Sequence, residues 1–179
     1  ALVPSCALML KFEWPLIVPE DENIKRLSAA TWDVAEYVVD IAMTEGLAEG
    51  LGPLDGDVTV HLACHARAQN MGPKAAEMLR LIPETNVAII ERCSGHGGSW
   101  GAMKNNFDVA LKVGRPVARQ AVKALQQSAE KGRKRYIASE CPLAGQHIVQ
   151  GIEREDASAL IAEAPHPIKL FAAAYGLAY

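Results

Sequence analysis

Short runs of β-branched and apolar residues alternate along this chain with longer segments whose apolar residues recur at helical spacing. Three such runs, Val58–Leu62, Val87–Ile90 and Tyr136–Ala138, are predicted strands, and a helical segment follows each of them closely. A repeated strand–helix order with short connections favours parallel pairing, because a parallel pair of strands needs a crossover helix. The expected fold class is therefore α/β, with a mostly parallel sheet flanked by helices.

The start of the chain is expected to add a further strand. This strand, Leu2–Ser5, is predicted to lead into a short helix from Ala7 to Trp14 that Pro15 stops. Apolar residues then recur every three or four positions over Ile24–Ala42, which indicates one long amphipathic helix.

Three more helices are expected in the rest of the chain. They cover the region of Ala75–Ile82, roughly Phe107–Ala129, and Ile168–Leu177. Gly114 and Pro116 are predicted to kink or divide the second of these helices.

The size and charge of the chain limit its class. A length of 179 residues, half of them apolar, fits a single domain covering 1–179. A net charge of −3 gives no electrostatic reason to expect nucleic acid as a partner. Four basic residues that cluster between a helix and a strand are interpreted as a solvated turn ending that helix: Lys131, Arg133, Lys134 and Arg135. The chain has no initiator Met, so we expect a fragment or a processed chain.

All four cysteines follow a short strand-like run and precede a helical segment. They are Cys6, Cys64, Cys93 and Cys141. In an open α/β sheet, ligands bind outside the carboxyl ends of the strands, and converging thiolates are typical of a metal or an iron–sulfur cluster. Each cysteine taken singly could instead be an inert core residue, but four matching positions favour a common site. Four cysteines are too few for a disulfide scaffold of this length, so reduced thiols in the cytoplasm are expected.

The most concentrated chemistry lies in the glycine-rich run Cys93–Gly101. The backbone N–H groups of Ser94, Gly95, Gly97 and Gly98 can form a nest for an anion or for the sulfides of a cluster. A phosphate-binding loop is the competing interpretation, but the run lacks both G-x-G-x-x-G and the Walker Lys-Ser/Thr ending.

Three polar residues are candidates for the same site. His96 lies inside the glycine-rich run and is the best candidate among the histidines for a ligand or a hydrogen-bond donor. His65 and Arg67 follow Cys64 directly and are expected at the mouth of the same cleft, where they could hydrogen-bond a cluster or offset its negative charge.

The other histidines have simpler interpretations. His61 lies within a predicted strand and is expected to be a hydrogen-bonded core residue. His147 follows Cys141 by six residues, so that it faces either the site or a helix surface, and His166 precedes a proline at a helix entry.

The cysteine segments together resemble a known family, the cysteine-rich CCG domain. The resemblance rests on Cys64-His-Ala-Arg, on Cys93-Ser-Gly-His-Gly-Gly-Ser-Trp-Gly and on Glu140-Cys141-Pro-Leu-Ala. That domain occurs in heterodisulfide reductase, in lactate-utilisation iron–sulfur proteins and in an iron–sulfur component of anaerobic glycerol-3-phosphate dehydrogenase. The opening Ser5–Pro15 and the closing His166–Ala174 are most similar to the last of these, so the resemblance spans nearly the whole chain.

The resemblance implies a C-terminal CCG domain of a longer protein that carries electrons and is not itself catalytic. It implies a [4Fe–4S] cluster on the four cysteines, with the glycine-rich run, His65 and Arg67 around it. It further implies partners, namely a flavin-containing dehydrogenase subunit and other iron–sulfur domains, with quinone or another redox partner as acceptor. The expected place is the cytoplasm, including peripheral association with the cytoplasmic face of the inner membrane through such a complex.

The chain departs from the family pattern at two positions. Ser94 stands where the family has a second adjacent cysteine, and Ala144 stands where it has the last cysteine of a C-x-x-C motif. The resemblance therefore does not extend to the disulfide chemistry of the heterodisulfide reductase branch, whereas four thiols still suffice for one cluster or for a tetrahedral Zn²⁺.

Two alternatives remain open at the level of sequence. One is a zinc-stabilised or metal-free scaffold that docks partner subunits through apolar residues near Cys6. The other is thiol catalysis by Cys93 with His96 or His65 as the base.

Overall fold

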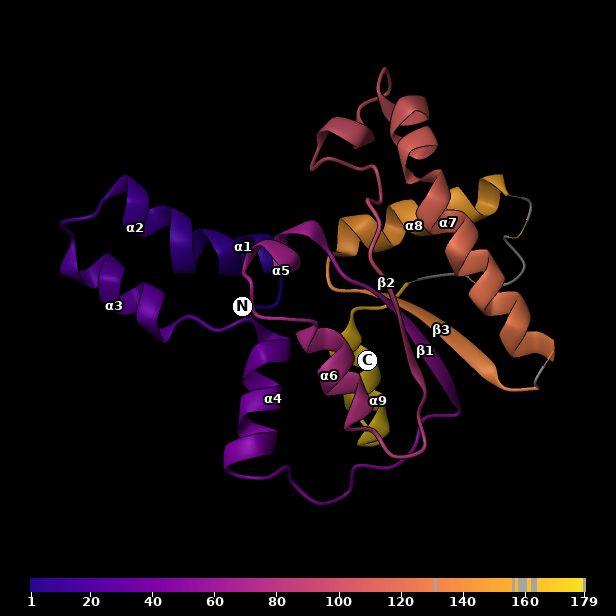
Figure 1. The fold of residues 1–179 in the computed structure, drawn as a ribbon, viewed down its shortest axis with the longest axis horizontal. Helices are drawn as coiled ribbons and strands as arrows, with labels where there is room; N and C mark the ends of the chain where they lie inside the picture. The colour runs from indigo at the N-terminus through magenta and orange to yellow at the C-terminus, as the bar shows by residue number, and fades with distance from the viewer. Residues whose placement is uncertain (131, 156, 158–160, 162–163, 179) are drawn as a thin grey trace.

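A three-stranded parallel sheet forms the centre of the molecule in the computed structural model, which describes residues 1–130, 132–155, 157, 161 and 164–178. The strands are β1 (Gly56–His61), β2 (Val87–Ile90) and β3 (Lys134–Ser139), arranged in the order β2-β1-β3 (Figure 1). Every residue of the central strand β1 is buried, as is typical of a parallel strand covered on both faces. The expected α/β class is confirmed.

Three helices cover one face of the sheet. They are α4 (Val34–Thr44), α6 (Lys74–Arg80) and α9 (Pro167–Ala174), and their apolar side chains pack with Val58 and Val60 of β1 in one core cluster.

Two helices cover the opposite face. These are α7 (Phe107–Glu130) and α8 (Pro142–Arg154), which share a second core cluster with Ile90 of β2 and Ile137 of β3 (Figure 1). Successive side chains of a strand point to opposite faces, so the sheet serves both clusters and gives a three-layer arrangement.

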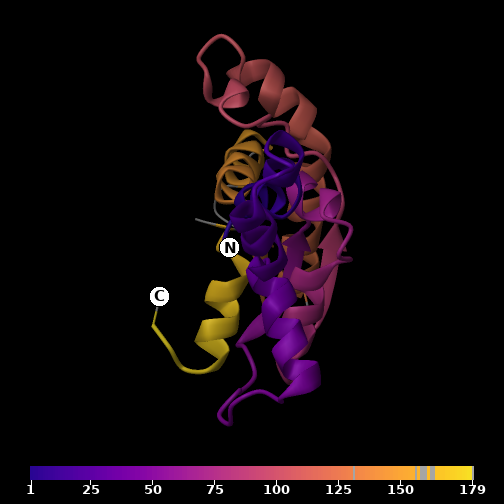
Figure 2. The same cartoon turned by 90° about the vertical axis from the view of Figure 1, so that its left-hand side faces the viewer.

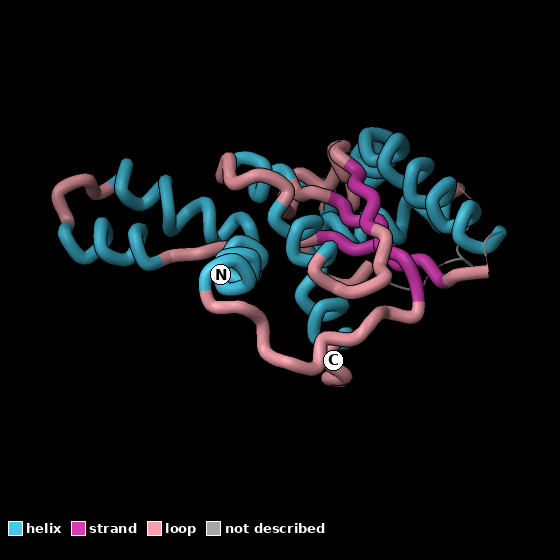
Figure 3. The backbone as a smooth tube through the Cα atoms, turned by 60° about the horizontal axis from the view of Figure 1, so that its bottom comes forward, coloured by secondary structure: helices cyan, strands magenta, loops and turns pink. Residues whose placement is uncertain are grey.

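The first thirty residues form a helical arm that projects from this body. The arm runs through α1 (Pro4–Leu8), the π-helical turn η1 (Met9–Glu13) and α2 (Trp14–Ile17) and returns through α3 (Glu22–Ala30) (Figures 1 and 3). In Figure 2 the arm points toward the viewer, in front of the sheet and its covering helices.

The predicted opening strand, Leu2–Ser5, is wrong, because no strand forms there and Pro4 and Ser5 already belong to helix α1. Pro4 occupies the first turn of α1, where its fixed φ and missing N–H fit a helix start. The predicted stop at Pro15 is also wrong, since Pro15 lies in the first turn of α2 and the helical path continues.

The single long helix predicted over Ile24–Ala42 is two helices in the structure. The chain leaves the helical conformation after α3, and Asp33 begins α4 as its N-cap. The Asp33 carboxylate accepts from the Ala35 N–H at 3.0 Å, and the Glu36 side chain accepts from the Asp33 N–H, which completes a capping box. The capping box therefore starts a new helix at Asp33, although the apolar spacing of the sequence continues across this position.

The helix α7 is continuous, so the predicted division at Gly114 and Pro116 is wrong, whereas the predicted kink stays a prediction. Pro116 is exposed, so water can solvate the carbonyl that loses its helical donor there. The predicted stop at Lys131 lies outside the described residues. The remaining elements are α5 (Cys64–Ala68), which follows β1, and a short 3-10 helix η2 (Trp100–Ala102) ahead of α7.

Candidate functional site

Three of the four cysteines follow strands that end at the same level. His61 pairs with Ile90 on one side and with Ser139 on the other, so the three strands finish side by side. Cys64, Cys93 and Cys141 come two or three residues after these positions, at the carboxyl edge of the sheet. This is the edge at which open α/β proteins bind ligands.

Cys6 reaches the same end of the molecule by another route. It lies in α1 and not at the end of a strand, which corrects the predicted position. Helix α1 lies against α5, the helix that Cys64 begins (Figure 1). The Gln69 side chain, just after α5, donates to the Pro4 carbonyl at 3.3 Å and ties the two segments together.

All four thiols are free and accessible to solvent. Cys6, Cys64 and Cys93 are exposed, and Cys141 is half-buried. Free cysteine is among the residues most often buried, so four accessible thiols at one end of a sheet contradict the interpretation as inert core residues.

The glycine-rich run is seated directly on the first turns of α7. Gly95 has φ +86°, and a Cβ placed on it would lie 2.1 Å from the Ala110 carbonyl oxygen. A Cβ on Gly114 would lie 2.2 Å from the Ser94 carbonyl oxygen. Only glycine at both positions lets loop and helix approach this closely. Gly114 was predicted only as a kink, so its part in the site was missed.

The loop backbone is directed at one of the thiols. The Gly95 N–H donates to the Cys93 sulfur at 3.4 Å. Gly97 and Gly98 also have positive φ, +53° and +64°, a conformation that favours glycine, and the predicted nest stays a prediction.

His96 connects the loop to a second cysteine. Its Nδ1 shares a hydrogen bond of 2.8 Å with the Ser94 hydroxyl, and its Nε2 lies 3.9 Å from the Cys141 sulfur. Burial lowers the pKa of His96, and the nearby positive charges of His147 and His65 lower it further. The ring is therefore neutral at neutral pH, as a ligand or a directed hydrogen-bonding group must be.

His65 and Arg67 are exposed on α5, next to Cys64. The positive charge of Arg67 contributes to the lowered pKa of His61, after burial and the charge of His96. The expected role of His65 and Arg67 beside a cofactor remains a prediction.

His61 is a buried, hydrogen-bonded core residue, as predicted. Its Nδ1 lies 3.1 Å from the Ser139 hydroxyl and its Nε2 lies 2.8 Å from the Arg92 carbonyl. His166 is the N-cap of α9 and accepts from the Ile168 N–H at 3.2 Å, which confirms its expected place at a helix entry.

Glu140 is a site residue that the sequence reasoning missed. It precedes Cys141 and is buried, and its carboxylate accepts from the Ala63 N–H at 3.2 Å. Desolvation raises the pKa of Glu140 to about 7, and the charge of Asp33 adds to the rise. Ala63 precedes Cys64, so Glu140 ties two of the cysteine segments together. An acidic residue at the end of a buried strand is the signal that could have indicated it.

The four thiols do not form a ready-made site for one ion. Among the described residues, no three His, Cys, Asp or Glu side chains are grouped closely enough to hold a metal ion. A tetrahedral zinc site needs its sulfurs about 2.3 Å from the metal. Thiolates are soft ligands that suit an iron–sulfur cluster and zinc alike, so the donor chemistry does not choose between the two.

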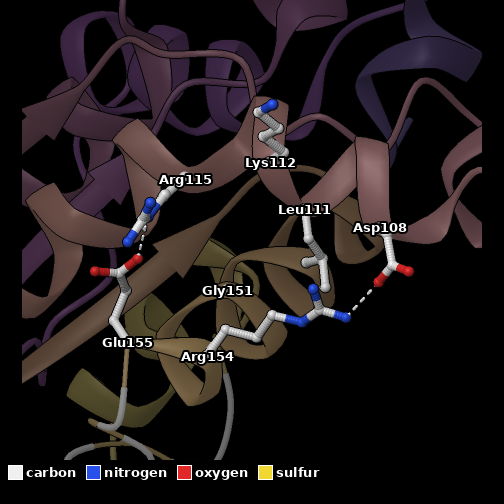
Figure 4. Close-up of a pocket in the computed structure, with 7 residues that line it drawn as sticks. All are labelled: Asp108, Leu111, Lys112, Arg115, Gly151, Arg154 and Glu155. Atoms are coloured by element: carbon white, nitrogen blue, oxygen red, sulfur yellow. Dashed lines mark hydrogen bonds and ion pairs between the residues drawn. The ribbon is translucent and has the colours of Figure 1, made fainter.

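A separate cleft of about 260 Å³ lies between α7 and α8, where Lys112 of α7 is close by (Figure 4). Its charges are largely paired across the two helices. Arg154 donates to Asp108 at 2.6 Å and Arg115 to Glu155 at 2.6 Å. None of the predicted site residues lines this cleft, so we assign no function to it.

The chain is similar to two kinds of curated protein. It is 29% identical to lactate utilization protein A of Geobacillus thermodenitrificans (strain NG80-2) over 150 residues, which cover 76% of this chain and 55% of that protein. It is 32% identical to lactate utilization protein A of Geobacillus kaustophilus (strain HTA426) over 130 residues, 66% of this chain and 47% of that protein.

The second kind is one of the subunits of anaerobic glycerol-3-phosphate dehydrogenase from Escherichia coli (strain K12). Identity is 25% over 122 residues, 65% of this chain and 29% of the dehydrogenase polypeptide. The chain thus spans about half the length of the lactate utilization proteins and less of the dehydrogenase polypeptide. No family model matches the chain, and no solved structure matches it. The chain is a distant relative of redox-associated proteins.

No helix in the described part of the chain combines the length and the apolar character needed to cross a membrane.

Proposed function

We propose that this chain is an iron–sulfur electron-transfer domain of a larger oxidoreductase. The observation that carries the proposal is that three free thiols follow the carboxyl ends of the three parallel strands, while the fourth, that of Cys6, lies on helix α1, which contacts α5. The similarity to proteins named for lactate utilization and for glycerol-3-phosphate dehydrogenation supports a redox role.

In this proposal Cys6, Cys64, Cys93 and Cys141 hold a [4Fe–4S] cluster of the CCG type. Such a cluster supplies reversible one-electron transfer when bound. The protein provides an N–H donor at Cys93 from Gly95 and a neutral imidazole from His96 beside Cys141. Hydrogen bonds to cluster sulfurs tune the reduction potential, so these contacts are its expected determinants.

The proposed partners follow from the same similarity. Electrons enter from a flavin-containing dehydrogenase subunit or another iron–sulfur domain and leave toward quinone or a second redox partner. Accessible reduced thiols suit the cytoplasm. We place the complex there, including the cytoplasmic face of the inner membrane.

The arm offers a surface for such docking. Several of its large apolar side chains are exposed, and Leu16 and Ile17 at its tip are 80% and 72% exposed. The same arm supports the docking part of the scaffold alternative, so docking alone does not separate the two functions.

Thiol catalysis by Cys93 has weaker support. His96 is engaged with Ser94 through Nδ1 and directs Nε2 toward Cys141 instead of Cys93. A base must lie within hydrogen-bond reach of the nucleophile that it activates.

Anaerobic purification followed by iron and zinc analysis tests the proposal. We expect bound iron and a broad absorption near about 400 nm that dithionite bleaches. Colourless protein with stoichiometric zinc and no iron, even after anaerobic reconstitution, would favour the scaffold and contradict electron transfer. Aerobic loss of colour with no zinc bound is expected for an oxygen-labile cluster.

A further inference from the structure

The outer face of α7 is strongly basic, although the chain as a whole is acidic. Between positions 100 and 123 the sequence has five Lys or Arg residues and one Asp, whereas the whole chain has 18 Lys and Arg and 21 Asp and Glu. Four of the five lie three or four positions apart, so they share one face of the helix. These four residues, all exposed, form a basic stripe: Lys112, Arg115, Arg119 and Lys123.

Folding does not account for this concentration of positive charge. Arg115 and Arg119 share a single carboxylate, that of Glu155, so one positive charge is left over. No described residue forms an ion pair with Lys112 or Lys123, and in Figure 4 the Lys112 side chain points away from Glu155. Like charges four positions apart destabilise a helix. The basic stripe therefore opposes helix formation in the isolated chain, and an external negative charge would offset that effect.

Exposed apolar side chains accompany the basic stripe. Val109 and Val113 of α7 are 53% and 50% exposed, and Trp100 and Met103, in η2 and just after it, are 45% and 55% exposed. The short helix η2 contacts α7, and both project beyond the rest of the molecule at the top of Figure 1. Protein interfaces are enriched in Trp, Met and Arg and have a polar rim, so this surface is typical of a docking site.

The distribution of charge favours a protein as the occupant over a nucleic acid or a membrane. The acidic residues that predominate in the rest of the chain repel a polyanion or an anionic membrane that extends beyond α7. An acidic patch on a folded protein can match one helix face without meeting the remaining surface. Apolar contacts with Val109 and Val113 also require an apolar counterpart, which a phosphate backbone lacks.

We infer that the basic stripe of α7 docks an acidic surface of a partner protein, with the exposed apolar side chains beside it as the contact core. The same turns of α7 contact the glycine-rich run through Ala110 and Gly114, so the partner lies across one helix from the Cys93 segment. Naming this partner as the redox partner rests on the proposed function. The docking itself does not, because no cysteine belongs to this surface.

A synthetic helical peptide with Glu and Leu on one face is the probe, and its matched control has Gln in place of every Glu. Binding to the 179-residue chain is followed by peptide fluorescence anisotropy and by the backbone ¹⁵N shifts of the chain. We expect saturable binding of the Glu peptide that weakens as salt is added, with shift changes around Lys112 and Val113 and none in the arm. The Gln peptide should bind at least about tenfold more weakly. Equal affinity of the two peptides, or no saturable binding of the Glu peptide, overturns the inference.

Three variants separate docking on α7 from a general effect of net charge. Lys112→Glu should weaken binding of the Glu peptide about fivefold, because it replaces an attraction by a repulsion. Arg26→Glu, at an exposed position of the arm, makes the same change in charge and should alter the affinity by less than about twofold. Val113→Ser should weaken binding about threefold through lost apolar contact. Unchanged affinity in folded Lys112→Glu or Val113→Ser protein, or equal losses in Lys112→Glu and Arg26→Glu, overturns the inference.

Duplex DNA and phosphatidylserine vesicles test the choice of a protein as the occupant. We expect neither to bind the chain under the conditions in which the Glu peptide saturates it. Binding of either one as tightly as the peptide overturns the assignment to a protein partner. Iron loading enters none of these outcomes, so the inference and the proposed function can fail separately.

Discussion

The two ends of the sheet are built in opposite ways. At the amino end, acidic and basic side chains pair, Arg135 with Asp57 at 3.4 Å and Lys134 with Asp55 at 3.5 Å, although the buried Nε of Arg135 has no partner among the described residues. At the carboxyl end, four thiols are free, and the buried oxygen Oε1 of Glu140 and nitrogen Nε2 of His147 have no partner among the described residues. Buried atoms without a partner therefore occur at both ends, and what distinguishes the two ends is the ion pairs at one and the free thiols at the other.

The largest expected effect is at the amino end, on stability alone. Asp57 is buried, pairs with the largely buried Arg135 and also accepts from the Asn86 N–H at 3.2 Å. Asp57→Ala leaves Arg135 without this carboxylate and should lower the free energy of unfolding by about 3–5 kcal/mol. Chemical denaturation measures this.

Asp55→Ala is the control for this change. Asp55 is mostly exposed, so its removal should lower the free energy of unfolding by less than about 1 kcal/mol. Both variants, where folded, should keep the iron content of the parent. A loss of iron in folded Asp57→Ala protein would contradict the expectation that the amino end of the sheet affects stability and not iron binding.

The next largest effect on stability is expected where the glycine-rich loop contacts helix α7. Gly95→Ala places a methyl group against the Ala110 carbonyl and should lower the free energy of unfolding by about 2–4 kcal/mol and reduce iron loading. Gly98→Ala shares the positive φ but meets open space, so about 1 kcal/mol is expected. Thermal denaturation and iron analysis compare the pair. Equal losses would show that contact between loop and helix does not hold the site.

A smaller effect is expected from the hydrogen bond between Ala63 and Glu140, which joins the segments of Cys64 and Cys141. Glu140→Leu removes the acceptor of the buried Ala63 N–H and should lower the free energy of unfolding by about 1–3 kcal/mol. Glu140→Gln keeps an acceptor and should change it by less than about 1 kcal/mol. Urea denaturation and iron loading separate the two variants. If the two variants lose the same stability and iron, Glu140 does not act through Ala63.

The smallest effect is the acid sensitivity of the carboxyl end. Burial holds the pKa of His61 below its ordinary value of 6.5, so below that pH the unfolded chain binds protons that the folded chain rejects. The contribution of His61 is therefore complete above about pH 6.5 and falls as the pH drops below it, whereas Glu140, whose pKa burial raises to about 7, acts in the opposite direction. His96 and His166 act in the same direction as His61, because burial also lowers the pKa of each.

The amino end should respond only at lower pH. The Tyr136 hydroxyl lowers the pKa of Asp55 from its ordinary value of 3.8, so that contact persists until the solution is more acidic. His61→Gln should retain about 1 kcal/mol more of its unfolding free energy than the parent between pH 7 and pH 5. Urea denaturation at the two pH values measures this. An identical pH dependence in parent and variant would show that His61 does not contribute to the acid sensitivity of the unfolding free energy.

The sheet could be predicted from the sequence because its strands are buried on both faces. Such strands are continuous β-branched runs bounded by turns, and the predicted Val58–Leu62, Val87–Ile90 and Tyr136–Ala138 overlap β1, β2 and β3. The opening run, Leu2–Ser5, could not be separated from a helix start, because a proline fits both interpretations.

The site could be predicted only as far as strand order determines it. Three cysteines reach one edge because each follows a strand, and this is visible in sequence. The close contact of Ser94 with Gly114 and the hydrogen bond from Ala63 to Glu140 join residues that lie far apart in the chain. No local pattern encodes such contacts, so these parts of the site required the structure.

The most direct test of the central claim is the ligand set itself. Iron and inorganic sulfide are counted after anaerobic reconstitution in the parent chain and in four variants, Cys6→Ser, Cys64→Ser, Cys93→Ser and Cys141→Ser. We expect about four irons and four sulfides per parent chain and a clear loss in every variant that folds. An unchanged iron content in any one folded variant would exclude that cysteine as a cluster ligand. A parent chain that binds no iron would contradict the proposed iron–sulfur function.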